Sequence, residues 1–267
     1  MPRANRYFLP GYIWHITHRC HKKEFLLKFA RDRRRYLHWL FEAKKRFGLC
    51  VLNYIVTSNH VHLLVKDTGG PVIAQSMQLI AGRTAQEYNE RKKRRGAFWE
   101  DRYHATAIGV DEHLHRCLVY IDLNMVRAGV VKHPSEWAHS GYREIQRPPD
   151  RYGIIDLAAL SELSGVADVA DLQKVHWRWV AEALTGEIAG REARWSEAIA
   201  VGSSAFVDDV KNGLGIKAMH REVLKAGQTH ELREQGEVYA GHFDGKSEAL
   251  RLYNAIPWEE YTANSEG

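Results

Sequence analysis

The chain has 267 residues, of which 45% are hydrophobic and 27% charged, a length that can bury the core of one large domain or two modest ones. It has no N-terminal signal segment, no apolar run as long as a membrane span and no Cys-x-x-Cys pair among its three cysteines. The composition therefore argues against a membrane-spanning protein and a disulfide framework, and predicts a reduced, cytoplasmic protein.

Charge is divided unevenly along the chain. Residues 1–150 contain 26 Lys and Arg against 14 Asp and Glu, a net charge of +12, whereas residues 151–267 contain 12 against 19, a net charge of −7. A positive field favours a polyanionic partner and raises its encounter rate. We therefore expect the first part of the chain to bind nucleic acid.

The first predicted elements are a strand and a helix. Residues 12–19 are aromatic and β-branched and predict a strand. Alternation places His15, Thr17 and Arg19 on one face of it, and the two histidines of the strand, His15 and His18, need not be metal ligands. Residues 28–47 have apolar side chains at helical spacing and predict an amphipathic helix that ends near Gly48. Its basic outer face is either a solvated surface or a track for phosphates.

Residues 52–65 predict a β-hairpin with a polar turn. On the second strand His60 and His62 share one face, so that two imidazoles on a rigid element could hold one divalent metal ion. The alternative is two satisfied side chains on a half-exposed strand. A nucleotide hydrolase of the histidine-triad type would need a third alternating histidine, and Leu64 occupies that position.

A second helix is predicted over residues 73–88, and it leads into a run of consecutive basic residues: Arg91, Lys92, Lys93, Arg94 and Arg95. Phe98 and Trp99 follow. Basic side chains neutralise phosphates, and aromatic rings stack on unpaired bases, so this segment is a candidate DNA-binding site. The alternative is a solvated helix end before a strand over residues 99–108, with both rings in the core.

The segment from Asp111 to Gly129 predicts a further helix, with Asp111 as the N-cap and Gly129 just past the end. Tyr120 and Asn124 are four residues apart and share a face beside the apolar stripe. A phenol and an amide one turn apart can serve one site, as a nucleophile and as an oxygen ligand to a hard cation. In isolation, a tyrosine at such a position more often packs than reacts.

The sequence Ser58-Asn59-His60-Val61-His62, together with the run from Tyr120 to Gly129, resembles the single-tyrosine HUH transposases, and most of all the REP-associated tyrosine transposases, over about residues 5–145. The resemblance implies an α+β fold, a ferredoxin-like antiparallel sheet with helices, and the predicted order of strand, helix, hairpin, helix, strand and helix agrees with it. Met125 stands where many relatives have proline.

The resemblance also implies a site and an activity. Tyr120 would be the catalytic nucleophile, and His60, His62 and Asn124 would bind Mg²⁺ or Mn²⁺. The enzyme would be a DNA strand transferase that cleaves and rejoins single-stranded DNA at hairpins such as REP-like palindromes, through a 5′-phosphotyrosine. We expect a monomer or homodimer that is nucleoid-associated when bound to DNA.

A site that cleaves DNA also needs positive charge, to bind phosphates and to assist the departing oxygen. We assign Arg19 and Arg102 to DNA binding together with the basic run at residues 91–95. Arg19, Arg102 and Arg127 are the candidates for assisting the departing oxygen, and the sequence does not choose among them.

Residues 146–153 have the composition of a linker, and they divide a transposase domain at residues 1–147 from a mostly helical C-terminal region at residues 148–267. Its helices are predicted at residues 155–163, 169–184 and 192–200. Residues 205–217 have the length and the glycine-containing turn of a helix-turn-helix, on a net-acidic segment.

Two other functions are compatible with these features. A non-catalytic hairpin-DNA-binding regulator with the same fold would bind DNA without metal and without the hydroxyl of Tyr120. A relaxase or replication initiator would use the same chemistry, but it would usually need accessory nuclease or helicase machinery, which we do not find in the sequence.

Overall fold

A computed structural model describes residues 8–110, 112–186, 190–218 and 221–234. The first elements are β1 (Ile13–Arg19), the 3₁₀ helix η1 (His21–Lys23), α1 (Ala30–Phe47), β2 (Cys50–Val56), β3 (His60–Lys66), α2 (Val72–Arg91) and β4 (His104–Ile108). These four strands lie in the order β2-β3-β1-β4 and all pair antiparallel. This is the ferredoxin-like arrangement that the sequence predicts.

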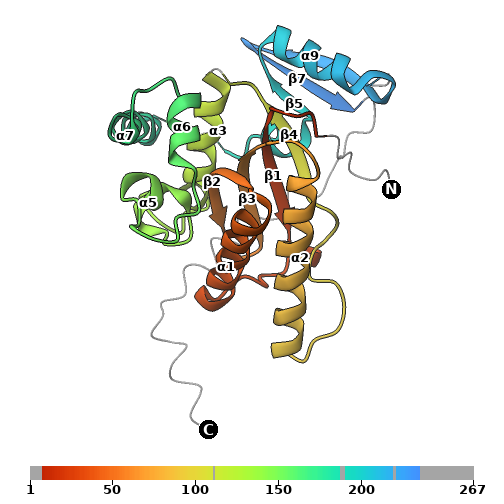
Figure 1. The fold of residues 1–267 in the computed structure, drawn as a ribbon, viewed down its shortest axis with the longest axis vertical. Helices are drawn as coiled ribbons and strands as arrows, with labels where there is room; N and C mark the ends of the chain where they lie inside the picture. Colours follow the sequence, from red (N-terminus) through yellow and green to blue (C-terminus); the bar gives the residue numbers. More distant parts are fainter. Residues whose placement is uncertain (1–7, 111, 187–189, 219–220, 235–267) are drawn as a thin grey trace.

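Helices α1 and α2 lie side by side across one face of this sheet (Figure 1). On that face His18 of β1 stacks on Trp99 with ring centroids 4.0 Å apart, and Trp99 lies 6.2 Å from the ring of Tyr36 on α1. The indole N–H of Trp99 donates to the carbonyl of Ala81 on α2 at 3.0 Å. Alternation sends the side chains at 15, 17 and 19 to the opposite face of the sheet. The histidine pair of β3 lies on that face as well, because it is paired with residues 17 and 19.

The tyrosine helix is divided into α3 (Glu112–Asp122) and α4 (Asn124–Arg127), with Leu123 between them. Asp111, the expected N-cap, lies outside the described residues. Gly129 follows α4 with φ +69°, and Gly48 ends α1 with φ +72°. Both values are in the left-handed region that glycine adopts without steric cost, so the two predicted helix ends are confirmed.

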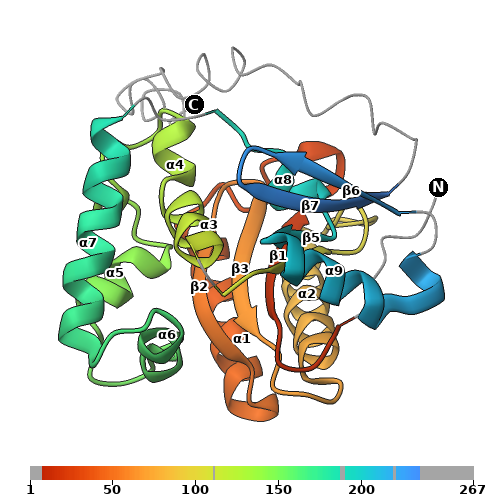
Figure 2. The ribbon, with the colours of Figure 1, turned by 90° about the horizontal axis from the view of Figure 1, so that it is seen from above.

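The remaining elements are η2 (Pro134–Glu136), α5 (Gly141–Gln146), α6 (Leu157–Leu163), α7 (Val169–Thr185), α8 (Arg194–Glu197), β5 (Ala200–Gly202), α9 (Ser204–Leu214), η3 (Gly215–Ala218), β6 (Arg221–Ala226) and β7 (Thr229–Glu234). Helices α3 to α7 gather beside β2, whereas β5, β6, β7 and α9 lie beyond β4 (Figure 2). No helix in the described part of the chain is long and apolar enough to cross a membrane.

Strands β5, β7 and β6 continue the sheet beyond β4, and the sequence analysis does not predict them. Half of the residues in strands β6 and β7 are charged and the first strand is largely exposed, so the hairpin lacks the apolar alternation that marks a strand. The predicted helix at residues 192–200 is reduced to the single turn of α8. The helix-turn-helix interpretation is wrong, because α9 is followed by a 3₁₀ turn.

A buried polar contact joins the two parts of the chain that the sequence separates. His176 of α7 donates from Nε2 to Oδ2 of Asp122 on α3 at 2.8 Å, and both side chains are almost fully buried. Asn53 of β2 donates to the other carboxylate oxygen at 3.0 Å. Residues after 147 therefore pack on the core of the first part, and the boundary between 147 and 148 stays a prediction.

His139, in the loop before α5, makes stability depend on pH. The side chain is 8% exposed, and burial, with a contribution from Arg33 and Arg34, lowers its pKa to about 4. The unfolded chain takes up this proton near pH 6.5 and the folded chain only near pH 4, so folding becomes less favourable as pH falls through that window. We expect the unfolding temperature to fall less between pH 7 and pH 5 in His139→Gln than in wild type. Each 1 kcal/mol of free energy that this histidine costs at low pH corresponds to roughly 2–4 °C. Equal acid sensitivity of the two proteins would contradict this.

Candidate active site

The candidate site lies on the face of the sheet opposite α1 and α2. In the pairing of β1 with β3, Arg19 is opposite His60 and Thr17 is opposite His62. Directly opposed residues in antiparallel strands point to the same face, so β1 and β3 both supply side chains to this surface. His62 is 4% exposed, and His60, at the strand end, is partly exposed. The histidine pair is thus near the rim of the sheet.

His60 is held as a neutral imidazole with a defined proton position. Its Nδ1 lies 2.7 Å from Oδ1 of Asn59 and 3.0 Å from Oγ1 of Thr57. Because an amide oxygen only accepts, Nδ1 carries the proton and Nε2 keeps its lone pair. Burial, followed by the charges of nearby arginines, lowers the pKa of His60 to about 3. The ring is therefore neutral near pH 7 and can bind a cation through Nε2.

His62 also presents an unprotonated Nε2 to the site. The amide nitrogen of Asn124 lies 3.1 Å from this atom, and an amide N–H can only donate, so Nε2 accepts. Burial, and then the neighbouring His60, lowers the pKa of His62 well below its ordinary value. Rotation of the Asn124 amide would exchange Nδ2 for Oδ1 and offer an oxygen instead. Two neutral imidazoles and an amide oxygen suit a divalent cation such as Mn²⁺ or Mg²⁺.

Tyr120 faces this group of side chains from α3. Its ring centroid lies 5.9 Å from that of His62 and 6.2 Å from that of His15, and the residue is 6% exposed. The guanidinium carbon of Arg127 lies 4.0 Å from the ring centroid, and its Nη2 donates to the Tyr120 carbonyl at 2.6 Å. Burial raises the pKa of the Tyr120 phenol, and Arg127 and then Arg191 oppose that rise. The structure thus gathers Tyr120 with the histidine pair and Asn124.

Three arginines surround the site. Arg19, Arg127 and Arg191 each lower the pKa of His60 electrostatically, which places their charges near the histidine pair. The sequence analysis names the first two and misses Arg191, which lies beyond the predicted linker and has no motif around it. Arg102 is exposed, and among the described residues no recorded contact joins it to the site.

Carboxylates and cysteines do not add to this site. Within the described residues there is no group of three or more His, Cys, Asp or Glu side chains arranged to hold a metal ion. The candidate ligands among the described residues are His60, His62 and the amide of Asn124.

Comparison with known proteins identifies the part of the chain that carries this site. A protein-family model described as "Transposase IS200 like" matches residues 10–124. The similarity to the IS200-like transposase family thus extends over residues 10–124, which is less than half of the chain. The matched segment contains the histidine pair, Tyr120 and Asn124, whereas Arg127 and the whole C-terminal region lie beyond it. The comparison with curated proteins gives no match.

Two solved structures are similar to the chain. One is a REP-associated tyrosine transposase bound to a REP hairpin, with 20% identity over 57% of this chain and 90% of that one, and a TM-score of 0.47. The other is a protein from Deinococcus radiodurans r1 assigned as a transposase, with 18% identity over 43% of this chain and 91% of that one, and a TM-score of 0.32.

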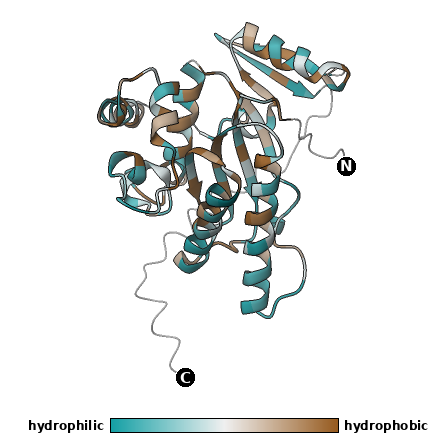
Figure 3. Cartoon of the chain, viewed as in Figure 1, coloured by the Kyte–Doolittle hydropathy of each residue, from teal (hydrophilic) through white to brown (hydrophobic). Residues whose placement is uncertain are grey.

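The basic run at residues 91–95 is partly engaged inside the protein. Arg91 pairs with Asp32, and Arg94 donates to the carbonyl of Ala97 at 2.9 Å. The other three basic side chains of the run are exposed: Lys92, Lys93 and Arg95. The end of α2 and the loop after it are hydrophilic (Figure 3). This surface is accessible to a polyanion through three of the five assigned residues.

The aromatic residues after the basic run belong to the core of the first part of the chain. Phe98 is 2% exposed and packs against Tyr88 of α2, with ring centroids 5.0 Å apart. Trp99 stacks on His18 and is hydrogen bonded to α2. The core interpretation is therefore confirmed for both rings, and stacking on DNA bases by these two residues is not supported.

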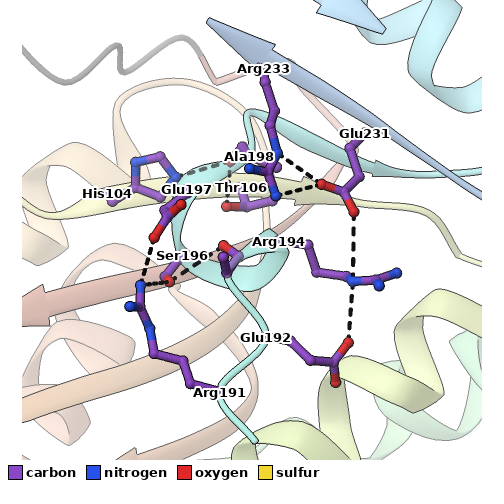
Figure 4. Close-up of polar contacts among 11 residues, drawn as sticks. His104, Thr106, Arg191, Glu192, Arg194, Ser196, Glu197, Ala198, Glu231 and Arg233 are labelled. Atoms are coloured by element: carbon purple, nitrogen blue, oxygen red, sulfur yellow. Dashed lines mark hydrogen bonds and ion pairs between the residues drawn. The ribbon is translucent and has the colours of Figure 1, made fainter. Parts of the chain in front are cut away.

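The segment of residues 191–198, which contains α8, adds groups to the site that no sequence pattern indicates. Its Trp195 ring lies 5.9 Å from that of Tyr120, and the Trp195 carbonyl oxygen lies 2.7 Å from Nδ1 of His15. Polar contacts hold the segment in place (Figure 4). Arg191 binds Ser196 and Glu197, and Arg194 lies between Glu192 and Glu231. The C-terminal region therefore reaches the candidate active site.

Proposed function

We propose that this chain is a metal-dependent transposase that cleaves and rejoins single-stranded DNA, with Tyr120 as the nucleophile. The observation that carries the proposal is that the tyrosine helix, with Tyr120 and Asn124, meets His62 of β3 on one face of the sheet. A nucleophile beside two neutral imidazoles and an amide is the set of groups that metal-assisted phosphoryl transfer needs.

His60 and His62, through Nε2, and Asn124, through its amide oxygen, would hold Mg²⁺ or Mn²⁺. When bound, the cation would neutralise charge on the scissile phosphate and orient it for in-line attack. The two histidines are neutral near pH 7, so they do not have to lose a proton before they bind it.

The chain's own groups account for the rest of the reaction. The Tyr120 oxygen forms a bond to phosphorus as the bond from phosphorus to the 3′ oxygen breaks, and the phenol proton is lost as the departing oxygen gains one. This leaves a 5′-phosphotyrosine and a free 3′-hydroxyl. Arg127 favours the phenolate because its charge lies over the Tyr120 ring. A later 3′-hydroxyl can reverse the step, which makes the reaction strand transfer and not hydrolysis.

Single-stranded DNA that contains hairpins, such as REP-like palindromes, is the proposed substrate. Lys92, Lys93 and Arg95 form an exposed positive surface that could follow a DNA backbone, and Arg19 and Arg127 bring positive charge close to the reacting phosphate. An unpaired strand can bend a phosphate toward a partly buried site more readily than a duplex can.

The test is a covalent adduct between protein and DNA. Full-length protein would be incubated with labelled hairpin-containing single strands from its own genomic flanks, with Mn²⁺ or with EDTA. We expect an adduct that resists denaturant only when Mn²⁺ is present. In His62→Ala the adduct yield should fall at least about 10-fold, because one of two imidazole ligands is lost. An equal yield in EDTA or in His62→Ala would contradict the metal assignment.

A hairpin-DNA-binding regulator is the second candidate, and the 6% exposure of Tyr120 favours it, because a buried phenol must become accessible before it attacks. Such a protein would bind the same DNA equally well in EDTA and after Tyr120→Phe. Tight binding without any adduct across several hairpins would support the regulator and would contradict the transposase.

A further inference from the structure

His15 and Trp195 form a hydrogen-bonded chain behind the candidate metal ligand His62. Nδ1 of His15 lies 2.7 Å from the carbonyl oxygen of Trp195, and Nε2 of His15 lies 2.9 Å from Nδ1 of His62. His15 is fully buried and His62 is 4% exposed, so water does not compete for these contacts. The sequence analysis does not assign His15 to the site.

The direction of each hydrogen bond in this chain is fixed. A carbonyl oxygen only accepts, so Nδ1 of His15 must carry a proton. A fully buried imidazole is neutral, so Nε2 of His15 has no proton and must accept from Nδ1 of His62. The only ring nitrogen of His62 without a proton is then Nε2, which faces Asn124. One backbone carbonyl thus determines which nitrogen of His62 is available.

The segment that carries the Trp195 carbonyl is hydrogen bonded to the sheet. Nε2 of His104 and Oγ1 of Thr106, both on β4, donate to the carbonyl of Ala198 at 2.9 Å and 2.7 Å (Figure 4). The Trp195 side chain is 2% exposed. The segment of residues 191–198 is therefore anchored to β4 at Ala198, three residues after the carbonyl that contacts His15.

We infer that His15 is a positioning residue for the metal site, and that the C-terminal region completes this site through the carbonyl of Trp195. The inference rests on the proposed metal-binding role of His62. It gives the region after residue 147 a function in the reaction centre, beyond the segment that matches the transposase family. A histidine that ligates a metal usually donates its other N–H to a fixed acceptor, which sets ring orientation and basicity.

The experiment measures the tautomer of His62 and the affinity for Mn²⁺ in the full-length protein. Variants are His15→Leu, which removes the acceptor, and His15→Gln, whose amide oxygen can replace it. The matched control is His139→Leu, which removes another buried histidine whose printed ring contact, with Trp137, lies outside residues 191–198 and away from His62. Thermal unfolding and hairpin-DNA binding in EDTA report whether each variant keeps its fold.

In metal-free wild type, ¹⁵N NMR of the histidine rings should show His62 protonated at Nδ1. His15→Leu should weaken Mn²⁺ binding about 10- to 100-fold, His15→Gln less, and His139→Leu hardly at all. Wild-type His62 protonated at Nε2, or Mn²⁺ affinity unchanged in His15→Leu, would overturn the inference. Should His15→Leu fail to fold, the tautomer of His62 in wild type and the Mn²⁺ affinity of His15→Gln decide whether the inference holds.

The two proposals fail in different ways. If wild type binds no Mn²⁺, or His62→Ala binds it as tightly as wild type does, the proposed metal site is wrong and this inference falls with it. If wild type forms a Mn²⁺-dependent adduct and His15→Leu keeps full Mn²⁺ affinity, only the role of His15 is wrong.

Discussion

Replacing Tyr120 with phenylalanine is expected to abolish the covalent protein–DNA adduct, with a loss of at least about 10³-fold in its rate of formation. The substitution removes one oxygen atom and keeps the ring that packs between Arg127 and Trp195. The fold, the metal site and the DNA-binding surface should therefore be unchanged. The measurement is adduct formation on labelled hairpin DNA with Mn²⁺, beside DNA affinity in EDTA.

The matched control for that variant is Tyr142→Phe. Tyr142 on α5 is 3% exposed and packs against His176, so it is a buried tyrosine close to the same helix but outside the proposed site. We expect it to form the adduct at nearly the wild-type rate. An adduct of undiminished yield in Tyr120→Phe would show that another group is the nucleophile.

Removing the imidazole of His176 is expected to destabilise the whole protein by about 3–5 kcal/mol. The Asp122 carboxylate is 1% exposed and accepts from His176 and from Asn53. In His176→Ala this buried acceptor loses one donor and cannot recover it from water. Urea unfolding of wild type and variant, followed by circular dichroism, gives the change in free energy of unfolding.

A second substitution tests whether the loss of stability in His176→Ala is caused by the Asp122 carboxylate. Asp122→Asn removes the charge, so the cost of His176→Ala should be smaller in the Asp122→Asn background than in wild type, by at least roughly 1 kcal/mol. Equal costs in both backgrounds would mean that His176 stabilises the protein only by filling space. The contact joins α3 to α7, so the result also measures how firmly the C-terminal region holds the tyrosine helix.

Local periodicity was sufficient for the parts of the site that lie within one element. Alternation along a strand places His60 and His62 on one face, and a spacing of four along a helix places Tyr120 near Asn124, because backbone geometry alone sets these relations. The glycines at 48 and 129 end their helices for the same local reason. The order of elements then predicted the ferredoxin-like sheet, and the motif pair predicted the family that residues 10–124 match.

What the sequence by itself determined is therefore the fold of the first part, the histidine pair and the tyrosine helix. Only the tertiary structure decided that Tyr120 faces His62, that Arg91 is engaged by Asp32, and that strands β5 to β7 extend the sheet. It also decided the contact between His15 and the Trp195 carbonyl, 180 residues apart along the chain. Such contacts depend on how distant elements pack. Every residue has a backbone carbonyl, so no sequence pattern can indicate which one will accept from His15.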